Sequence, residues 1–198
     1  MDFSSLIKNR KKVLKPTKTI VTNTSGEKFE ISSGIVRDLG IKVSPFIIDD
    51  KPNLNIDMII PGLFLSSQDP VIDLDILNSH KIKHVLSLGI DPDIKFHGIN
   101  YYYVNILDLP EFDLLEVLNN CIEIIHKNIN ENILVHCNAG VSRSPTIIIG
   151  YLMALKKISY SQSYEIVKNK RYIRPNDGFV NKLMNLQHQD LPQVDKIN

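Results

Sequence analysis

The sequence contains no tryptophan and only two cysteines, Cys121 and Cys137, among its 198 residues. Two thiols cannot build the disulfide framework of a small secreted protein, and they are too few for a zinc site made of cysteines. Cys121 shares an apolar helical stripe with Leu114, Leu118 and Ile125, so we expect it to be an inert core thiol. Any cysteine chemistry must therefore come from Cys137.

Long apolar runs and an excess of one charge are also missing. No stretch reaches the roughly 18 apolar residues of a membrane-spanning helix, and the first segment, MDFSSLIKNRKKVLK, lacks the apolar core of a secretory signal. The formal net charge of +1 gives no overall attraction for nucleic acid or for an anionic membrane. We therefore expect a cytoplasmic protein, with a nuclear pool left open, that binds no nucleic acid and does not span a membrane.

A change of composition near residue 52 divides the chain. Residues 1–20 carry six Lys or Arg and one Asp, which predicts an exposed basic tail. Two short apolar runs between Thr19 and Ile31 flank Ser25-Gly26 and predict a β-hairpin. The residues from there to about Lys51 are typical of an ordered extension or a linker. The predicted organisation is a basic, partly ordered N-terminal extension (1–52), one main domain (53–192) and a C-terminal tail (193–198).

Strand and helix patterns alternate after residue 52. The apolar runs MIIPGLFLSS, HVLSLG, YYYVNIL and NILVHC predict strands. Helical periods cover 69–79, 112–128, 143–157, 160–170 and 177–188. Strands separated by helices predict an α/β fold with a mixed, mostly parallel central sheet that is covered on both faces.

One segment, ILVHCNAGVSRSPTIIIGYLM, joins an apolar strand to an apolar helix through a short loop between Cys137 and Arg143. Gly140 can adopt backbone angles closed to other residues, so successive N–H groups of the loop can turn toward one centre near the helix N-terminus. Such a site binds a phosphate and stabilises Cys137 as a thiolate nucleophile. Arg143 can donate two parallel hydrogen bonds to phosphoryl oxygens.

The Cys-x5-Arg spacing alone arises by chance in roughly 5% of such chains, but its flanking strand, helix, His, Gly and hydroxyl make it specific. HCNAGVSRSPT resembles the signature loop of the protein tyrosine phosphatase superfamily, and its Ala-Gly-x-Ser-Arg-Ser form resembles the small atypical dual-specificity branch. The resemblance extends from about Asn55 to Gln187, with PGLFLSSQD and RPNDGF. The basic extension resembles that of the branch member that regulates a stress-activated kinase pathway. The resemblance implies a phosphatase-like fold and a phosphocysteine intermediate, and it implies that the chain needs no metal or other cofactor.

The resemblance also implies roles for individual residues. Cys137 is the nucleophile, and Ser144 stabilises its thiolate when it leaves. Asp108, which follows a strand, matches the general acid, with Asp113 and Glu111 as alternatives. Asp113 lies where a helix begins and is suited to cap it. The phosphate-binding residues are those of the loop, namely Asn138, Ala139, Gly140, Val141, Ser142 and Arg143, and His136 supports the loop by hydrogen bonding.

These observations predict a dual-specificity phosphatase that hydrolyses phosphotyrosine and phosphoserine or phosphothreonine in other proteins. We expect it to act as a monomer on phosphorylated proteins of MAP-kinase pathways, either MAP kinases or their activators. The basic run KNKRYIR (168–174) is predicted to lie near the site and attract acidic substrates. A phosphoinositide or RNA 5′-phosphate substrate is one alternative, although the variable loop positions carry no charge. A phosphoprotein-binding scaffold with little turnover is the other.

Overall fold

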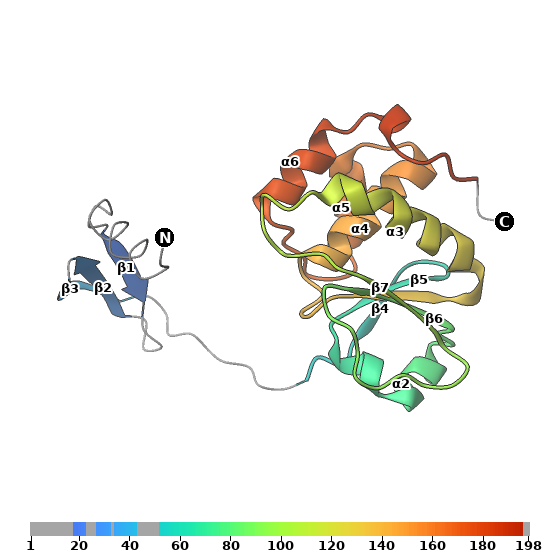
Figure 1. The fold of residues 1–198 in the computed structure, drawn as a ribbon, viewed down its shortest axis with the longest axis horizontal. Helices are drawn as coiled ribbons and strands as arrows, with labels where there is room; N and C mark the ends of the chain where they lie inside the picture. Colours follow the sequence, from blue (N-terminus) through green and yellow to red (C-terminus); the bar gives the residue numbers. More distant parts are fainter. Residues whose placement is uncertain (1–17, 23–26, 33, 43–51, 196–198) are drawn as a thin grey trace, which may run out of the picture. The chain divides into compact units, whose positions relative to one another are not determined.

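The computed structural model describes residues 18–22, 27–32, 34–42 and 52–195. The chain divides into two compact units, residues 1–51 and residues 52–198 (Figure 1). In the smaller unit, three strands form an antiparallel sheet in the order β1-β2-β3. They are β1 (Thr19–Thr22), β2 (Glu27–Ser32) and β3 (Ile35–Lys42).

The hairpin predicted in the smaller unit is confirmed, because β1 and β2 pair antiparallel with Thr19 opposite Ile31. Its predicted turn residues, Ser25 and Gly26, lie outside the described residues. Of the two alternatives expected after the hairpin, an ordered extension or a linker, 35–42 form the ordered one, because β3 pairs with β2, although the sequence did not predict this strand. Its β-branched residues favour a strand. Asp38 and Gly40 within it are turn-forming residues that concealed the pattern.

The larger unit is built on a five-stranded sheet with the order β4-β5-β8-β6-β7. In this order the strands are Ile56–Ile60, Leu63–Ser66, Ile133–His136, His84–Leu88 and Asn100–Val104. β4 is antiparallel to β5, whereas β5, β8, β6 and β7 are parallel. The central strand β8 is buried at all its positions, as expected for an apolar strand covered on both faces. The predicted mixed, mostly parallel sheet is confirmed.

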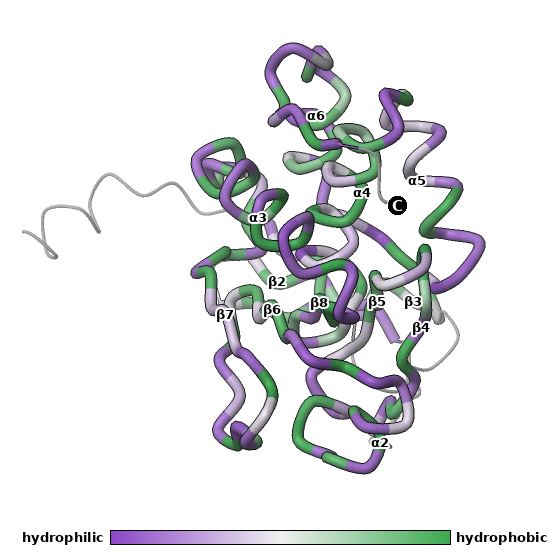
Figure 2. The backbone as a smooth tube through the Cα atoms, turned by 90° about the vertical axis from the view of Figure 1, so that its right-hand side faces the viewer, coloured by the Kyte–Doolittle hydropathy of each residue, from purple (hydrophilic) through white to green (hydrophobic). Residues whose placement is uncertain are grey.

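Helices cover both faces of this sheet, with more of them on one face than on the other. One layer contains α3 (Leu114–Asn128), α4 (Arg143–Lys156), α5 (Tyr160–Lys168) and α6 (Asp177–Asn185), which pack around α4 (Figure 1). α4 is buried from Ser144 to Ala154, so it is the central helix of the unit. The other face is covered by α2 (Leu74–Ser79), which Figure 2 also places across the sheet from α4 and α6. Leu77 of α2 belongs to the apolar cluster on that face.

The single helix predicted over 69–79 was wrong, because the structure divides it. A 3-10 turn covers Asp69–Ile72, and α2 begins at Leu74. Asp73 between them has an extended backbone, and its carboxylate accepts hydrogen bonds from the N–H groups of Asp75 and Ile76 at 3.0 and 3.1 Å. An N-cap of this kind starts a helix and does not lie inside one. The other predicted helices are present, and each agrees with its prediction at one end and is one to three residues shorter at the other.

We predict that Asp73→Ala lowers the free energy of unfolding by about 1 kcal/mol, because two N–H groups of α2 lose their acceptor. Asp73→Asn keeps an accepting oxygen and should retain most of the stability. Urea unfolding of the three proteins at pH 7 measures both effects. Equal losses in the two variants would show that the charge of Asp73, and not the cap, stabilises α2.

Candidate functional site

The loop 138–142 connects the C-terminal end of β8 to the N-terminus of α4. In α/β sheets this edge, at the carboxyl ends of parallel strands, is where ligands bind. Cys137 is the first residue after β8 and is only 2% exposed. The structure therefore contains the strand, tight loop and helix that the sequence predicts, with the thiol at the base of the loop.

Gly140 fits the loop against the end of β5 for two reasons. Its φ of +67° lies in the left-handed region, which favours glycine. A Cβ at this position would also lie 2.4 Å from the carbonyl oxygen of Ser66. A larger residue would therefore strain the backbone and displace the loop from β5.

The two thiols of the chain lie in different surroundings. The hydroxyl of Ser144, which is fully buried, donates a hydrogen bond to Cys137 Sγ at 3.2 Å. A donor at this position stabilises negative charge on the sulfur. Cys121 lies in the core of α3, where burial raises the pKa of its thiol to about 12. The expectation that Cys121 is a core thiol is confirmed.

The guanidinium of Arg143 is bound at one edge and free at another. Its Nη1 donates to the carbonyl oxygen of Leu88, at the end of β6, at 3.1 Å. This contact requires Gly89, since a Cβ there would lie 2.3 Å from Nη1. Within the described part of the chain, the buried Nε of Arg143 has no hydrogen-bond partner. Arg143 is therefore positioned by β6 and retains a donor for an oxyanion.

Asp108 reaches the loop from the segment that follows β7. Its Oδ1 accepts hydrogen bonds from Ser142 Oγ and from Asn176 Nδ2, both at 2.7 Å. Asn176 is the N-cap of α6, and its own Oδ1 accepts from the N–H of Phe179 at 2.9 Å. One amide side chain thus caps α6 and positions the carboxyl group of Asp108.

The two alternative acids lie differently. Asp113 is at the N-cap position of α3, but its side chain makes no capping hydrogen bond, contrary to expectation. Glu111 is exposed. Among the described residues, neither carboxylate makes a hydrogen bond to the loop 138–142, whereas Asp108 does.

His136 connects two neighbouring strands beneath the loop. Its Nε2 lies 2.7 Å from Ser87 Oγ of β6, and the residue is 1% exposed. Burial lowers the pKa of His136 to about 4, although the main chain of Cys137 acts in the opposite direction. The ring is therefore neutral near pH 7 and suited to a hydrogen bond that supports the loop, the role that the sequence predicts for it.

The sequence did not predict roles for Asn176 and Arg171. Asn176 could have been found, because Asn before an acidic first helical turn is a common start signal. Arg171 belongs to the basic run expected to attract acidic substrates, yet it is 8% exposed and contacts the back of the loop. Nothing in the sequence distinguishes it from the exposed Lys170 beside it.

Comparison with known proteins agrees with this geometry. Residues 63–189 match the family model of the dual specificity phosphatase catalytic domain. The chain is 36% identical over 208 residues to a probable dual specificity protein phosphatase of Dictyostelium discoideum, covering 86% of this chain and 90% of that protein. It is 36% identical over 146 residues to mouse dual specificity protein phosphatase 19, covering 72% of this chain but 66% of that protein. The match to the dual specificity protein phosphatase MPK-4 of Drosophila melanogaster covers only 35% of the length of that protein.

Solved structures share the fold. The crystal structure of DUSP15 superposes with a TM-score of 0.62 at 32% identity, over 65% of this chain and 85% of that chain. A human tyrosine phosphatase-like serine/threonine/tyrosine-interacting protein gives a TM-score of 0.60 at 29% identity, over 65% of this chain and 92% of that chain. The chain belongs to the dual specificity phosphatase family, in the small atypical branch that its loop sequence resembles.

Among the described residues, no helix is long and apolar enough to cross a membrane.

The low pKa of His136 predicts a loss of stability in acid. The unfolded chain takes up a proton at this ring near the ordinary pKa of 6.5, whereas the folded chain does so only near 4. Because the unfolded state binds more protons in between, the free energy of unfolding falls by about 3 kcal/mol from this group as the pH drops through that interval. Denaturant unfolding at several pH values should give a shallower slope for His136→Gln. Parallel slopes would contradict a buried, neutral ring.

Proposed function

We propose that this chain hydrolyses phosphotyrosine and phosphoserine or phosphothreonine in proteins through a phosphocysteine intermediate on Cys137. The observation that carries the proposal is the convergence of three features around the loop that follows Cys137. Ser144 donates to the sulfur of Cys137, Arg143 retains a buried donor, and Asp108 is bonded to Ser142. Nucleophile, oxyanion donor and acid are the parts that such a reaction needs.

In the first step, the Cys137 thiolate attacks phosphorus in line with the departing oxygen. An S–P bond forms while the P–O bond to the tyrosine, serine or threonine breaks. The N–H groups of the loop and the guanidinium of Arg143 bind the three equatorial oxygens. Asp108 donates its proton to the departing oxygen, which would otherwise leave as an unstable phenoxide or alkoxide.

In the second step, a water molecule attacks the phosphorus of the phosphocysteine. The carboxylate of Asp108 accepts a proton from this water, the S–P bond breaks, and inorganic phosphate leaves. The hydroxyl of Ser144, 3.2 Å from the sulfur, stabilises the thiolate that is released. Since Oδ1 of Asp108 already accepts two hydrogen bonds, we assign the transferred proton to Oδ2.

Proteins of MAP-kinase pathways are the substrates that we propose. Two relatives support this by their names, Drosophila MPK-4 and a Dictyostelium MAP kinase phosphatase with leucine-rich repeats, the second 37% identical over 133 residues but covered over only 15% of its length. The variable loop positions Asn138, Ala139, Val141 and Ser142 carry no charge. They offer no extra cation for a phosphoinositide or an RNA 5′-phosphate. We further propose that the protein is a monomer in the cytoplasm and that a nuclear pool exists beside the cytoplasmic one.

Phosphoprotein binding without turnover is a second candidate function. It is suggested by the likeness to the human protein that is named as phosphatase-like and interacting. The presence of Cys137, Arg143 and Asp108 in one site favours turnover in this chain. Both functions predict phosphopeptide binding, so catalysis separates them.

We predict that Cys137→Ser abolishes hydrolysis of an aryl phosphate and of phosphorylated kinase activation-loop peptides, while peptide binding persists. Asp108→Asn should lower kcat by about 10² or more on the peptides, because the departing oxygen loses its proton donor. Asp113→Asn is the matched control and should retain activity. A larger loss in Asp113→Asn would contradict the assignment of the acid. Binding by the unaltered chain without any turnover would favour the scaffold function.

The contacts of Asn176 predict a separate effect. Asn176→Ser keeps a side-chain oxygen that can cap α6 but removes the amide donor to Asp108. We expect kcat for peptides, whose leaving groups need the proton, to fall about tenfold, with a smaller loss for an aryl phosphate that has an acidic leaving group. Thermal unfolding shows whether the cap of α6 is retained. Asn176→Ala, which removes both the cap and the amide donor to Asp108, is the comparison variant. Equal losses on both substrates would show that the loop itself is disturbed.

A further inference from the structure

The carbonyl groups of the loop 138–142 are all bonded to protein. Three of them use the main chain: Gln68 N donates to Asn138 O at 3.0 Å, Arg174 N to Val141 O at 2.8 Å and Thr146 N to Ser142 O at 3.1 Å. In a planar trans peptide the C=O and the following N–H point in opposite directions. A carbonyl that is bonded to protein behind the loop therefore directs the next N–H toward the ligand side.

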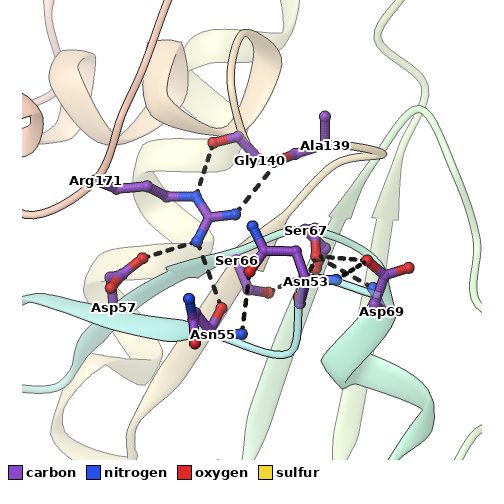
Figure 3. Close-up of polar contacts among 9 residues, drawn as sticks. All are labelled: Asn53, Asn55, Asp57, Ser66, Ser67, Asp69, Ala139, Gly140 and Arg171. Carbon is purple, nitrogen blue, oxygen red and sulfur yellow. Dashed lines mark hydrogen bonds and ion pairs between the residues drawn. The ribbon is translucent and has the colours of Figure 1, made fainter. Parts of the chain in front are cut away.

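Arg171 supplies the donors for the remaining two carbonyls. Its Nε donates to Gly140 O at 3.2 Å, and its Nη2 donates to Ala139 O at 3.4 Å. Figure 3 shows the guanidinium facing both oxygens across the back of the loop. One rigid, planar group thus fixes two successive peptides, which the single ammonium of a lysine cannot reproduce.

Asp57 and the chain beside it hold Arg171 in this orientation. Nη1 of Arg171 lies 2.7 Å from Asp57 Oδ2 and donates to Asn55 O at 3.4 Å (Figure 3). The same stretch is tied down at Asn53, whose carbonyl accepts from Ser67 Oγ at 2.8 Å. Asn53, Asn55 and Asp57 precede the part of the chain, 63–189, that matches the family model.

We propose that Arg171 is a positioning residue for the phosphate loop and that Asp57 acts through it, so that the stretch 53–57 controls the affinity of the loop for a phosphoryl group. The proposal rests on the proposed function only in taking the ligand to be a phosphoryl group. N–H donors that are already oriented stabilise the charge of the ligand without reorganisation. Without Arg171, two loop carbonyls lose their donors, and the loop relaxes to conformations that aim fewer N–H groups at the ligand.

A purely structural ion pair would affect stability alone, so the test separates oxyanion binding from turnover. Calorimetric titration of the full chain carrying Cys137→Ser with tungstate measures the loop without catalysis. Adding Arg171→Lys should weaken binding by about tenfold or more, since small misplacements of site groups have large effects. Asp57→Asn, at a less buried position, should weaken it by a smaller factor in the same direction. With Cys137 intact, kcat/KM for an aryl phosphate should fall in parallel.

The double variant carrying Arg171→Lys and Asp57→Asn should bind no worse than Arg171→Lys alone, because Asp57 acts through Arg171. The control is Lys127→Met, which removes an exposed cation of α3 outside the basic run 168–174, and it should change affinity by less than about twofold.

Two results would overturn the proposal. In the first, Arg171→Lys unfolds more easily than the unaltered chain yet keeps its tungstate affinity and kcat/KM. In the second, Lys127→Met loses as much tungstate affinity as Arg171→Lys. If the unaltered chain hydrolysed nothing while Arg171→Lys still weakened tungstate binding, the proposed function would fail and the positioning role would stand.

Discussion

The site depends on one constraint, which is the orientation of the five consecutive peptide groups whose carbonyls belong to residues 138–142. A carbonyl that is bonded to protein behind the loop keeps the following N–H directed at the ligand, and the protein provides a donor for each carbonyl of residues 138–142. Three neighbouring parts of the fold serve this arrangement: the end of β5, against which Gly140 packs, the first turn of α4, and the segment 171–176. The sheet brings these parts together because β8 lies between β5 and β6.

The two cysteines are equally buried but lie in different surroundings. Cys121 is surrounded by the apolar side chains of the core, where the charged form of a thiol is disfavoured and the pKa is raised to about 12. Cys137 is as well buried, but it lies at the end of a strand, beside a hydroxyl donor and a helix N-terminus. Burial next to oriented donors permits chemistry that burial among aliphatic side chains suppresses.

Much of the fold and the centre of the site could be predicted from the sequence, because both are local patterns. The strand, loop and helix around Cys137 are contiguous, and the alternation of strands and helices predicts the sheet. Arg171 could not be predicted, since its burial depends on contacts with Asp57, 114 positions away in the chain. The division of the helix at Asp73 was missed for a related reason: a capping aspartate and a helical one look alike until the backbone angles are known.

The most direct test of the central claim is to trap the covalent intermediate. The full chain is quenched in acid during turnover of an aryl phosphate and digested, and the phosphorylated peptide is identified by mass spectrometry. The account predicts a phosphoryl group on Cys137, none on Cys121, and no modified peptide in Cys137→Ser. Rapid turnover with Cys137 unmodified at every quench time, or a phosphoryl group on another residue, would contradict it.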